Sequence, residues 1–336
     1  MKARKTAVSK TKAALKGFCS ALKKHKSFFL SCHVTPEGDA IGSILAMQSL
    51  LKRLGKKTFV VCDDAFPERL HCLSDKDWHS MKELKTPYPQ FEAMVIADCP
   101  TLERIGAVKE LLSPETAIFN IDHHISNNRF GHHNYIRPQA AASGEVVMDI
   151  FKYFKMPLTK EEATNLYVAL STDTGSFKYS NTTVHSHRMA AELIATGIDV
   201  EKINEKLYAT YSLNKINLYS RLLSRVKTTA GSQVAWAALR REDLKNSGAT
   251  YEDTEGFIDF LRYIKEVKIA FFMSELENGH SIKVSFRSKA NYDVNKIATY
   301  FKGGGHRKAS GCTIPGTLEK AEAMILERLE KECDFS

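Results

Sequence analysis

Carboxylate and imidazole side chains are the residue types in this sequence that could do chemistry together, and they occur in four short segments. The segments are HVTPEGDAIGS with His33, Glu37 and Asp39, VIADCP with Asp98, IDHH with Asp122, His123 and His124, and STDTG with Asp173. A set of oxygen and nitrogen ligands without a thiolate favours Mn²⁺, Mg²⁺ or a related divalent ion over structural zinc. Five or six such ligands exceed what one ion requires, so we expect two ions that share a bridging carboxylate.

The elements that must position these side chains alternate between strands and helices. Apolar runs predict strands at 28–32, 58–62, 93–97 and 117–121, and helical periodicity predicts helices at 40–54 and 102–112. This alternation is typical of a mostly parallel sheet covered on both faces. Ligands bind such sheets beyond the carboxyl ends of the strands, so the four segments are expected to converge on one rim. A single Asp at a strand end is more often a cap or a turn former, but four groups together favour a metal centre.

The rest of the chain first turns helical and then predicts a second, smaller domain, with the boundary between Asp199 and Arg225. Helices expected at 145–154, 160–170, 184–196, 200–207 and 213–223 are followed by strands at 234–239, 267–276 and 281–286. A Gly-rich turn at 303–305, a short strand and a closing helix at 318–332 complete the pattern. The predicted fold class is therefore α/β, an N-terminal mostly parallel sheet flanked by helices, plus a smaller C-terminal α+β domain. We expect the active-site cleft between the two domains.

The net charge of the chain is concentrated at its start. The 336 residues include 48 Lys and Arg against 39 Asp and Glu, a formal net charge of +9. Nine basic residues and no acidic residue lie at positions 1–26, which leaves 39 residues of each sign in the remainder. The basic balance is therefore a property of this segment and not of the whole surface. We predict a packed basic helix whose apolar stripe is Leu15, Phe18, Cys19 and Leu22, with a nucleic-acid arm or a targeting segment as alternatives.

The composition excludes several classes of protein. Apolar residues make up 43% of the chain, which is incompatible with a disordered or fibrous protein. No stretch approaches the roughly 18 apolar residues of a membrane-spanning helix, so no membrane partner is expected. Seven cysteines without a C-x-x-C pair argue against a disulfide framework or a zinc knuckle and predict a reducing, cytoplasmic location. His132 and His133 are expected in a plain loop, and His185 and His187 on a solvated surface.

A second concentration of positive charge lies near the C-terminus. Residues 281–314 contain seven basic residues and one acid, Asp293. Within this stretch Gly303, Gly304 and Gly305 would allow backbone N–H groups to approach an anion closely. A tight turn with solvated lysines is the alternative interpretation.

Taken together, HVTPEGDAIGS, VIADCP, IDHH and STDTG, followed by GGGHRKASG, resemble the four motifs and the C-terminal signature of the DHH phosphoesterase superfamily. The chain looks most like its short, two-domain bacterial members, which act as oligoribonuclease (nanoRNase) and as phosphatase on 3′-phosphoadenosine 5′-phosphate (pAp). The resemblance extends from about residue 28 to residue 314. It implies four segments: a basic helix at 1–27, a catalytic DHH domain at 28–199, a helical linker at 200–224 and a DHH-associated substrate-binding domain at 225–336.

The resemblance also implies a role for each site residue. One Mn²⁺ would be held by His33, Glu37 and Asp98, and the other by Asp39, Asp98, His123 and Asp173, with Asp98 as the bridge. His124 would face the scissile phosphate, and Asp122 would orient an imidazole. The substrate clamp would consist of Arg287, Gly303, Gly304, Gly305, His306 and Ser310. One departure is Glu37, where the family usually has Asp; its longer side chain puts the first metal site in question.

The expected function is thus Mn²⁺-dependent hydrolysis of short oligoribonucleotides to mononucleotides and removal of the 3′-phosphate of pAp. Mg²⁺ or Co²⁺ are alternatives to Mn²⁺. Hydrolysis of cyclic or linear dinucleotides is the alternative activity, and a nucleic-acid-binding protein with a decayed metal centre is the non-enzymatic alternative. Short RNA and pAp are the expected partners. The sequence does not determine whether the protein is a monomer or a homodimer. It also leaves open the polarity of cleavage, the preference for RNA or DNA and the role of the basic helix.

Overall fold

Two units make up the chain, Met1–Thr210 and Tyr211–Ser336. The structure, a computed structural model, describes residues 2–67, 70–209, 211–276, 279–289 and 291–333. The segment expected to be a linker, 200–224, is divided between the units. Helix α6 (Val200–Tyr208) belongs to the first unit, and helix α7 (Leu213–Leu223) belongs to the second.

The first unit is built on a six-stranded sheet in the order β3-β2-β1-β4-β5-β6, in which every neighbouring pair is parallel. The strands are β1 (Ser27–Ser31), β2 (Lys57–Cys62), β3 (Trp78–Ser80), β4 (Ala93–Ala97), β5 (Ala117–Asp122) and β6 (His133–Ile136). Strand β1 lies beside β4, so the chain winds outward from this pair in both directions. The crevice at such a reversal point is where parallel sheets bind ligands.

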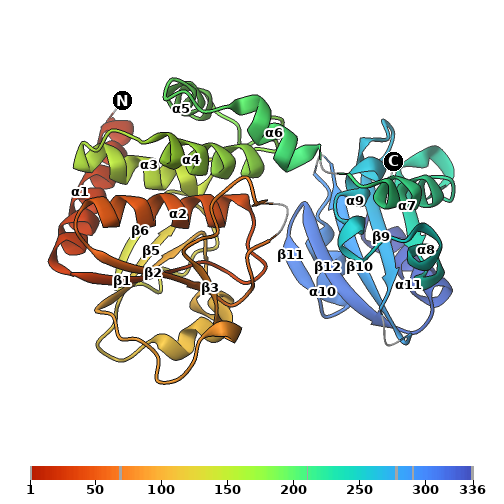
Figure 1. Cartoon of the computed structure of the whole chain (residues 1–336). Helices are drawn as coiled ribbons and strands as arrows, with labels where there is room; N and C mark the ends of the chain where they lie inside the picture. The colour runs from red at the N-terminus through yellow and green to blue at the C-terminus, as the bar shows by residue number, and fades with distance from the viewer. Residues whose placement is uncertain (1, 68–69, 210, 277–278, 290, 334–336) are drawn as a thin grey trace. The chain divides into compact units, whose positions relative to one another are not determined.

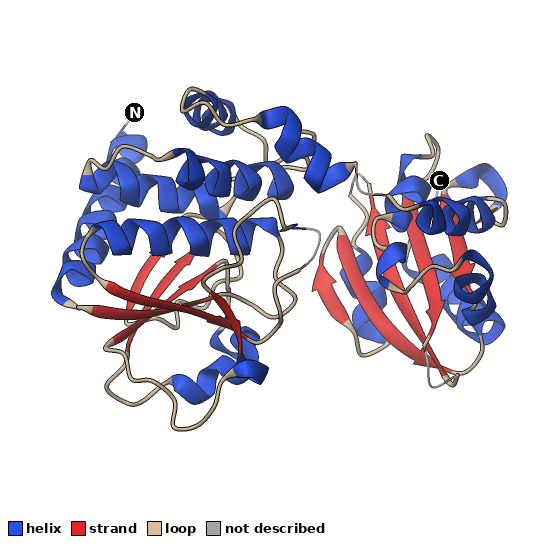
Figure 2. Cartoon of the chain, in the orientation of Figure 1, coloured by secondary structure: helices blue, strands red, loops and turns tan. Residues whose placement is uncertain are grey.

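Helices cover both faces of this sheet, as Figures 1 and 2 show. One face packs against α2 (Gly38–Arg53), α3 (Ser143–Phe154) and α4 (Lys160–Asp173), with α5 (Val184–Ile194) beyond them. The other face packs against the 3₁₀ helix η3 (Leu102–Leu111), while the short 3₁₀ helix η2 (Met81–Glu83) follows β3. Because both faces are covered, β1 and β4 are continuous apolar runs: Phe28 and Leu30 are buried under the helices, and Phe29 under η3.

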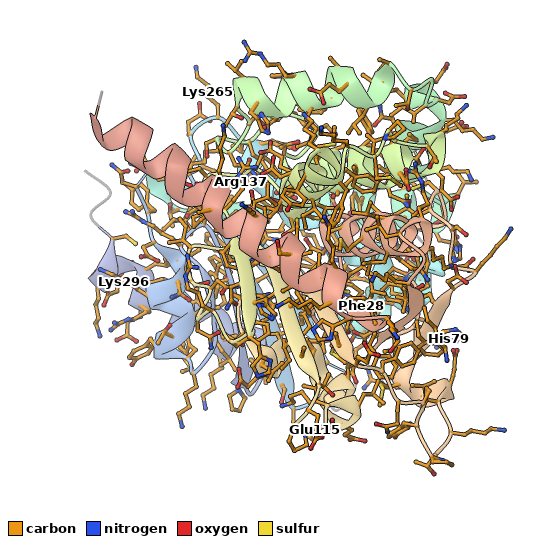
Figure 3. The ribbon with its side chains drawn as sticks, turned by 90° about the vertical axis from the view of Figure 1, so that its left-hand side faces the viewer. Phe28, His79, Glu115, Arg137, Lys265 and Lys296 are labelled. Carbon is orange, nitrogen blue, oxygen red and sulfur yellow. The ribbon has the colours of Figure 1, made fainter. Side chains whose placement is uncertain are left out.

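Helix α1 (Lys2–Lys24) packs on this unit through the apolar stripe predicted from the sequence. It contacts β6 and α3, and Figure 3 shows it passing in front of the sheet with Phe28 near its C-terminal end. Phe18, Cys19 and Leu22 are buried in the core of the unit. The Phe18 ring lies edge-on to Phe119, with 5.4 Å between the ring centroids. The C-terminal half of the basic helix is therefore part of the core.

The second unit is built on a mixed sheet in the order β11-β12-β10-β9-β8-β7. Its strands are β7 (Lys227–Thr228), β8 (Val234–Leu239), β9 (Ile269–Glu275), β10 (Ser281–Ser288), β11 (Gly304–His306) and β12 (Ala309–Pro315). Only β8 and β9 pair in parallel among these described strands. One face packs against α10 (Val294–Tyr300) and α11 (Leu318–Glu332), and the other against α7 and α9 (Phe257–Tyr263). Short helices α8 (Arg241–Ser247), η4 (Ala230–Ser232) and η5 (Glu252–Thr254) complete the unit.

The predicted fold class is confirmed, while several local predictions are wrong. His133 was expected in a loop, but it begins strand β6, because residues 133–136 pair with β5. The predicted helix at 102–112 is a 3₁₀ helix interrupted at Gly106, whose φ of 64° is incompatible with a continuous helix. Two of the three residues expected to form a tight turn, Gly304 and Gly305, lie in strand β11. Strand β3 and helices α8 to α10 had no prediction, because each is short and lacks a clear period.

Candidate metal centre

The candidate centre lies at the carboxyl ends of the strands of the first unit. His33 and Asp98 follow β1 and β4, the two strands at the reversal point, and Asp122 ends β5. Asp39 lies in the first turn of α2, and Asp173 is the last residue of α4. Asp98 has a φ of 55°, a left-handed conformation that is uncommon outside glycine and typical of functional sites. The sheet and two helices thus bring side chains from four sequence segments together.

Distances within the cluster suit ligands that share a cation. The Nε2 atom of His123 lies 3.8 Å from Asp39 Oδ2, 3.6 Å from Asp98 Oδ1 and 3.5 Å from Asp173 Oδ2. His33 Nε2 lies 3.5 Å from Asp98 Oδ2. Two donors that each lie about 2.1 Å from one ion are about 3 Å apart at a right angle and about 4 Å apart when opposed. The donor set and its spacing therefore fit one or two divalent cations.

Each imidazole is held through its Nδ1 atom. His33 Nδ1 lies 2.8 Å from the carbonyl oxygen of Val34, and His123 Nδ1 lies 3.1 Å from that of Ala140. A neutral ring that donates from Nδ1 presents an unprotonated Nε2, which is the form that binds a metal. In both residues it is Nε2 that points to the carboxylates. The backbone therefore orients both imidazoles for coordination.

His124 is oriented differently from the other two histidines. Its Nδ1 lies 2.7 Å from Asp122 Oδ1, and the same nitrogen is the one that approaches Asp98, at 3.6 Å. Asp122 is fully buried, and its Oδ1 also accepts the backbone N–H groups of His123 and His124 at 2.8 and 3.2 Å. Asp122 therefore holds the His124 ring through Nδ1, whereas backbone carbonyls hold the other two rings.

The N-terminus of α3 supplies donors that the sequence analysis missed. The backbone N–H groups of Ser143 and Gly144 donate to Asp39, at 2.6 and 2.9 Å, and Ser143 Oγ donates to Asp98 Oδ1 at 3.0 Å. Ser43 Oγ lies 3.1 Å from Asp39 Oδ1. A helix N-terminus stabilises carboxylates in this way. The Ser-Gly pair that precedes an apolar helical run at 145–154 was the available signal.

Crowding of the carboxylates perturbs their protonation. Burial, with the neighbouring charge of Asp98, raises the pKa of Asp39 well above its usual range and that of Asp173 to about 6. Burial alone would lower the pKa of His123, but Asp39, Asp98 and Asp173 outweigh it and raise that pKa to about 9. Burial alone would raise the pKa of Asp98, but its histidine neighbours lower it. The raised pKa values of Asp39, Asp173 and His123 mean that protons neutralise part of the negative charge of the cluster. A bound divalent cation would neutralise the same charge.

Two groups of at least three donors meet within 4.8 Å in the described part of the chain: Asp98 with His123 and His124, and Asp39 with His123 and Asp173. His33 joins the first group through Asp98 alone. Glu37 is in neither group. It is exposed at the start of α2, where its side chain forms no capping hydrogen bond. Asn181, which sequence reasoning also missed, donates to the backbone of Ala141 and to Asp173.

In the second unit, five of the six predicted clamp residues lie on three adjacent strands, and Gly303 directly precedes β11. Arg287 on β10 is opposite Ala309 on β12, and Ser310 is opposite Gly305 on β11. Arg287 Nη1 donates to the carbonyl oxygen of Phe286 at 3.1 Å. Ser310 is buried. The side chain of His306, a further predicted clamp residue, lies outside the described residues.

The three clamp glycines differ in what surrounds them. A Cβ atom on Gly303 would lie 2.2 Å from the carbonyl oxygen of Gly311, and one on Gly305 would lie 2.6 Å from that of Ala309. Both glycines are therefore required for β11 to approach β12. A Cβ atom on Gly304 would meet no described atom within 4 Å. Gly304 is thus the glycine whose small size the local packing does not explain.

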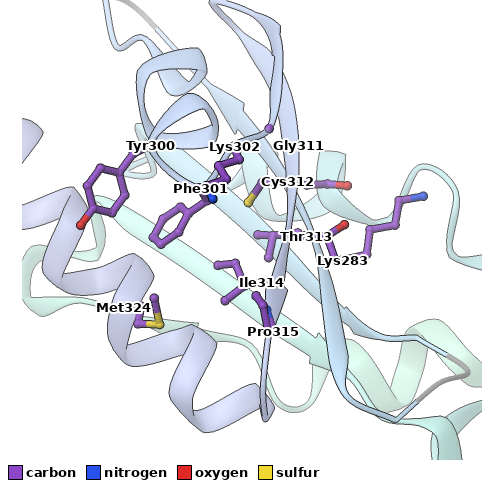
Figure 4. A pocket seen from close by; sticks show the side chains of 13 residues that line it. Lys283, Tyr300, Phe301, Lys302, Gly311, Cys312, Thr313, Ile314, Pro315 and Met324 are labelled. Atoms are coloured by element: carbon purple, nitrogen blue, oxygen red, sulfur yellow. The ribbon is translucent and has the colours of Figure 1, made fainter.

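A cavity of about 780 Å³ lies beside these residues in the second unit (Figure 4). Its walls include Phe301, Ile314 and Met324, with Lys302 and Gly303 at the Gly-rich segment. No carboxylate or imidazole is among the described residues that line it. The cavity is therefore separate in its chemistry from the carboxylate cluster of the first unit.

Among the described helices, none combines the length and the apolar character needed to span a bilayer.

The fold and the site define a class: a two-unit protein whose parallel-sheet unit carries a carboxylate–imidazole centre. Residues 27–170 match the DHH family, N-terminal domain, and residues 223–333 match the DHHA1 domain. A Thermus thermophilus protein named bifunctional oligoribonuclease and PAP phosphatase NrnA is 32% identical over 305 residues, 90% of this chain and 89% of that protein. The chain belongs to the DHH family.

Further relatives agree in length with this chain. The Bacillus subtilis protein that bears the same name is 24% identical over 313 residues, 92% of this chain and 96% of that protein. Among solved structures, an exopolyphosphatase-related protein from Bacteroides fragilis superposes with a TM-score of 0.89 at 28% identity. That match covers 95% of this chain and 96% of the other. The similarity therefore extends through both units.

Proposed function

We propose that the chain is a divalent-cation-dependent phosphoesterase that hydrolyses short oligoribonucleotides to mononucleotides and removes the 3′-phosphate of pAp. The observation that carries the proposal is the cluster of Asp39, Asp98, His123 and Asp173 at the rim of the sheet. The names of the relatives in Thermus thermophilus and Bacillus subtilis supply the substrate class.

We propose that the donor set holds two cations, and that they are Mn²⁺, with Mg²⁺ or Co²⁺ as alternatives. His33, Glu37 and Asp98 would hold one ion, and Asp39, Asp98, His123 and Asp173 would hold the other. Glu37 could join the centre only by a change of its side-chain conformation, because it is exposed and outside the donor groups. When bound, such cations polarise the phosphoryl group and lower the pKa of a water nucleophile.

In this proposal His124 acts on the scissile phosphate, and Asp122 positions the His124 ring. Asp122 fixes the His124 ring through Nδ1, and Nε2 is the nitrogen proposed to donate a proton or a hydrogen bond to a phosphoryl oxygen. An imidazole can donate from Nε2 while it donates from Nδ1 only when both nitrogens carry a proton. His124 is therefore proposed as the catalytic residue and Asp122 as its positioning residue.

Residues of the second unit are proposed to bind the other end of the substrate. The guanidinium of Arg287 suits a terminal phosphate, because it can donate two parallel hydrogen bonds. The open space at Gly304 would let a backbone N–H approach an anion, and Ser310 and His306 would add polar contacts.

A substrate panel tests the proposal. The protein with Mn²⁺ is given pAp, dinucleotides and five-residue RNAs, and product lengths are followed over time. Preferred hydrolysis of short RNA and pAp supports the proposal, whereas hydrolysis of dinucleotides alone supports a dinucleotide phosphodiesterase. Asp98→Ala should abolish turnover, and full activity in that variant would refute the bridging role. Calorimetric titration that shows no Mn²⁺ binding would favour a decayed centre.

The cytoplasmic location and the oligomeric state are part of the same proposal. All seven cysteines are free thiols in the structure, which is compatible with a reducing compartment. Fractionation of cells that carry the protein would test the location. Light scattering would decide between a monomer and a homodimer.

A further inference from the structure

Arg104 lies beside the candidate metal centre and is not one of its candidate ligands. It is in η3, the element that follows Asp98. Its carbonyl oxygen accepts the backbone N–H of Val34 at 2.8 Å, which ties η3 to the loop that carries His33. The residue is therefore held between the ends of β1 and β4, at the point where parallel sheets bind ligands.

The side chain of Arg104 is half-buried and carries a charge that no carboxylate balances within the described part of the chain. Other arginines of the first unit show the contrast. Arg53 Nη1 lies 2.7 Å from Glu162, and Arg137 Nη1 lies 2.6 Å from Asp149. Both of these side chains are partly buried, at 29% and 21% exposure, and each is paired with a carboxylate. A partly buried guanidinium is normally paired in this way.

Arg104 lies close to two candidate ligands of the metal centre. It is six positions after Asp98, and its backbone carbonyl binds Val34, the residue next to His33. A positive charge near a cation site repels the cation. Its presence is therefore unfavourable for metal binding by itself and becomes favourable only when an anion is present.

A phosphate group is the anion whose geometry suits this residue. The guanidinium donates through a planar fork to two oxygens of one phosphate, and it remains charged at every pH at which the enzyme could work. We propose that Arg104 binds the phosphate group that is attacked at the metal centre, an inference that rests on the proposed phosphoesterase function. Arg104 would then be a substrate-binding residue of the first unit, separate from the terminal-phosphate role proposed for Arg287.

The test compares Arg104→Met and Arg104→Lys with Lys109→Met, an exposed cation of the same helix η3. The first measurement is calorimetric binding of inorganic phosphate to the Mn²⁺-loaded protein, which requires no turnover. We expect Arg104→Met to weaken phosphate binding about 10- to 100-fold, Arg104→Lys to weaken it less, and Lys109→Met to leave it unchanged. Mn²⁺ affinity in Arg104→Met should be equal to that of the wild type or higher, and KM for pAp should rise.

Distinct outcomes would overturn the inference. Equal phosphate affinity in the wild type and Arg104→Met, or no phosphate binding in the wild type, would remove Arg104 from the site. Joint loss of Mn²⁺ affinity and thermal stability in both Arg104 variants would show a structural role instead. If the wild type hydrolyses neither RNA nor pAp but phosphate binding still depends on Arg104, the proposed function fails and the anion site stands.

Discussion

Ser143 offers the sharpest test of how the centre is built, because its side chain contacts one metal-ligand candidate and its backbone contacts another. In Ser143→Ala, the Oγ donor to Asp98 Oδ1 at 3.0 Å is lost, while the backbone N–H that donates to Asp39 at 2.6 Å remains. Ser143 is fully buried, so water cannot readily replace the lost donor. The variant therefore isolates the orientation of Asp98.

The expected magnitude follows from the type of hydrogen bond. A hydrogen bond to a charged, buried acceptor contributes about 1.5–3 kcal/mol. Loss of an interaction that orients a ligand typically costs about 10- to 100-fold in metal affinity. We expect the Kd for Mn²⁺, measured by titration calorimetry at pH 7.5, to rise at least about tenfold in Ser143→Ala.

Ser43→Ala is the matched control. Ser43 is equally buried and its Oγ donates to Asp39 at 3.1 Å, but Asp39 keeps two backbone donors from α3. Its Mn²⁺ affinity should change less than about threefold. The reasoning is refuted if Ser43→Ala weakens Mn²⁺ binding and Ser143→Ala does not, provided that both variants unfold at the temperature of the wild type.

Three further predictions concern the clamp and the protons of the centre. Arg287→Ala should raise KM for pAp with little change in kcat, since it removes substrate binding remote from the reaction; an unchanged KM excludes it from the clamp. Gly303→Ala should lower the free energy of unfolding by about 1–3 kcal/mol in denaturant titrations, because its Cβ would overlap Gly311. Gly304→Ala should leave the free energy of unfolding unchanged. A larger loss in Gly304→Ala than in Gly303→Ala would contradict the packing argument. Mn²⁺ binding at pH 7.5 should release a proton, because His123, with a pKa of about 9, is protonated without metal and must be neutral to bind it, so affinity falls as pH falls. Calorimetry in two buffers of different ionisation enthalpy measures this release, and identical heats would count against it.

Sequence reasoning succeeded where a local pattern alone determines the element. The runs at β1 and β4 are apolar on both faces because helices cover both sides of the sheet, and the period of α2 is equally clear. It failed where pairing with another strand determines the element. Strand β6 begins at His133 because residues 133–136 pair with β5 and the His133 ring packs on Phe119, with 4.7 Å between centroids.

The same distinction applies to the candidate site. Residue type and position predicted that four segments converge, and the family resemblance supplied the set of Asp39, Asp98, His123 and Asp173, whose three carboxylates the structure places around His123. The Ser143-Gly144 pair indicates where α3 begins, but the contacts of its donors with Asp39 and Asp98 depend on the packing of α3 against α2. Glu37 shows the opposite limit: its position in a motif predicted a ligand, while the structure places its side chain at an exposed helix start. Its role stays a prediction.

Helix α1 has a consequence for how the first unit can be shortened. The matched DHH domain begins at residue 27, but Phe18 and Leu22 are almost completely buried in the core of the unit. Burial of two such side chains contributes about 3–6 kcal/mol, a large part of the 5–15 kcal/mol that typically separates a native domain from its unfolded state. Truncation at residue 27 would therefore remove part of a cooperative folding unit. We expect the basic helix to unfold together with the sheet that carries the metal ligands.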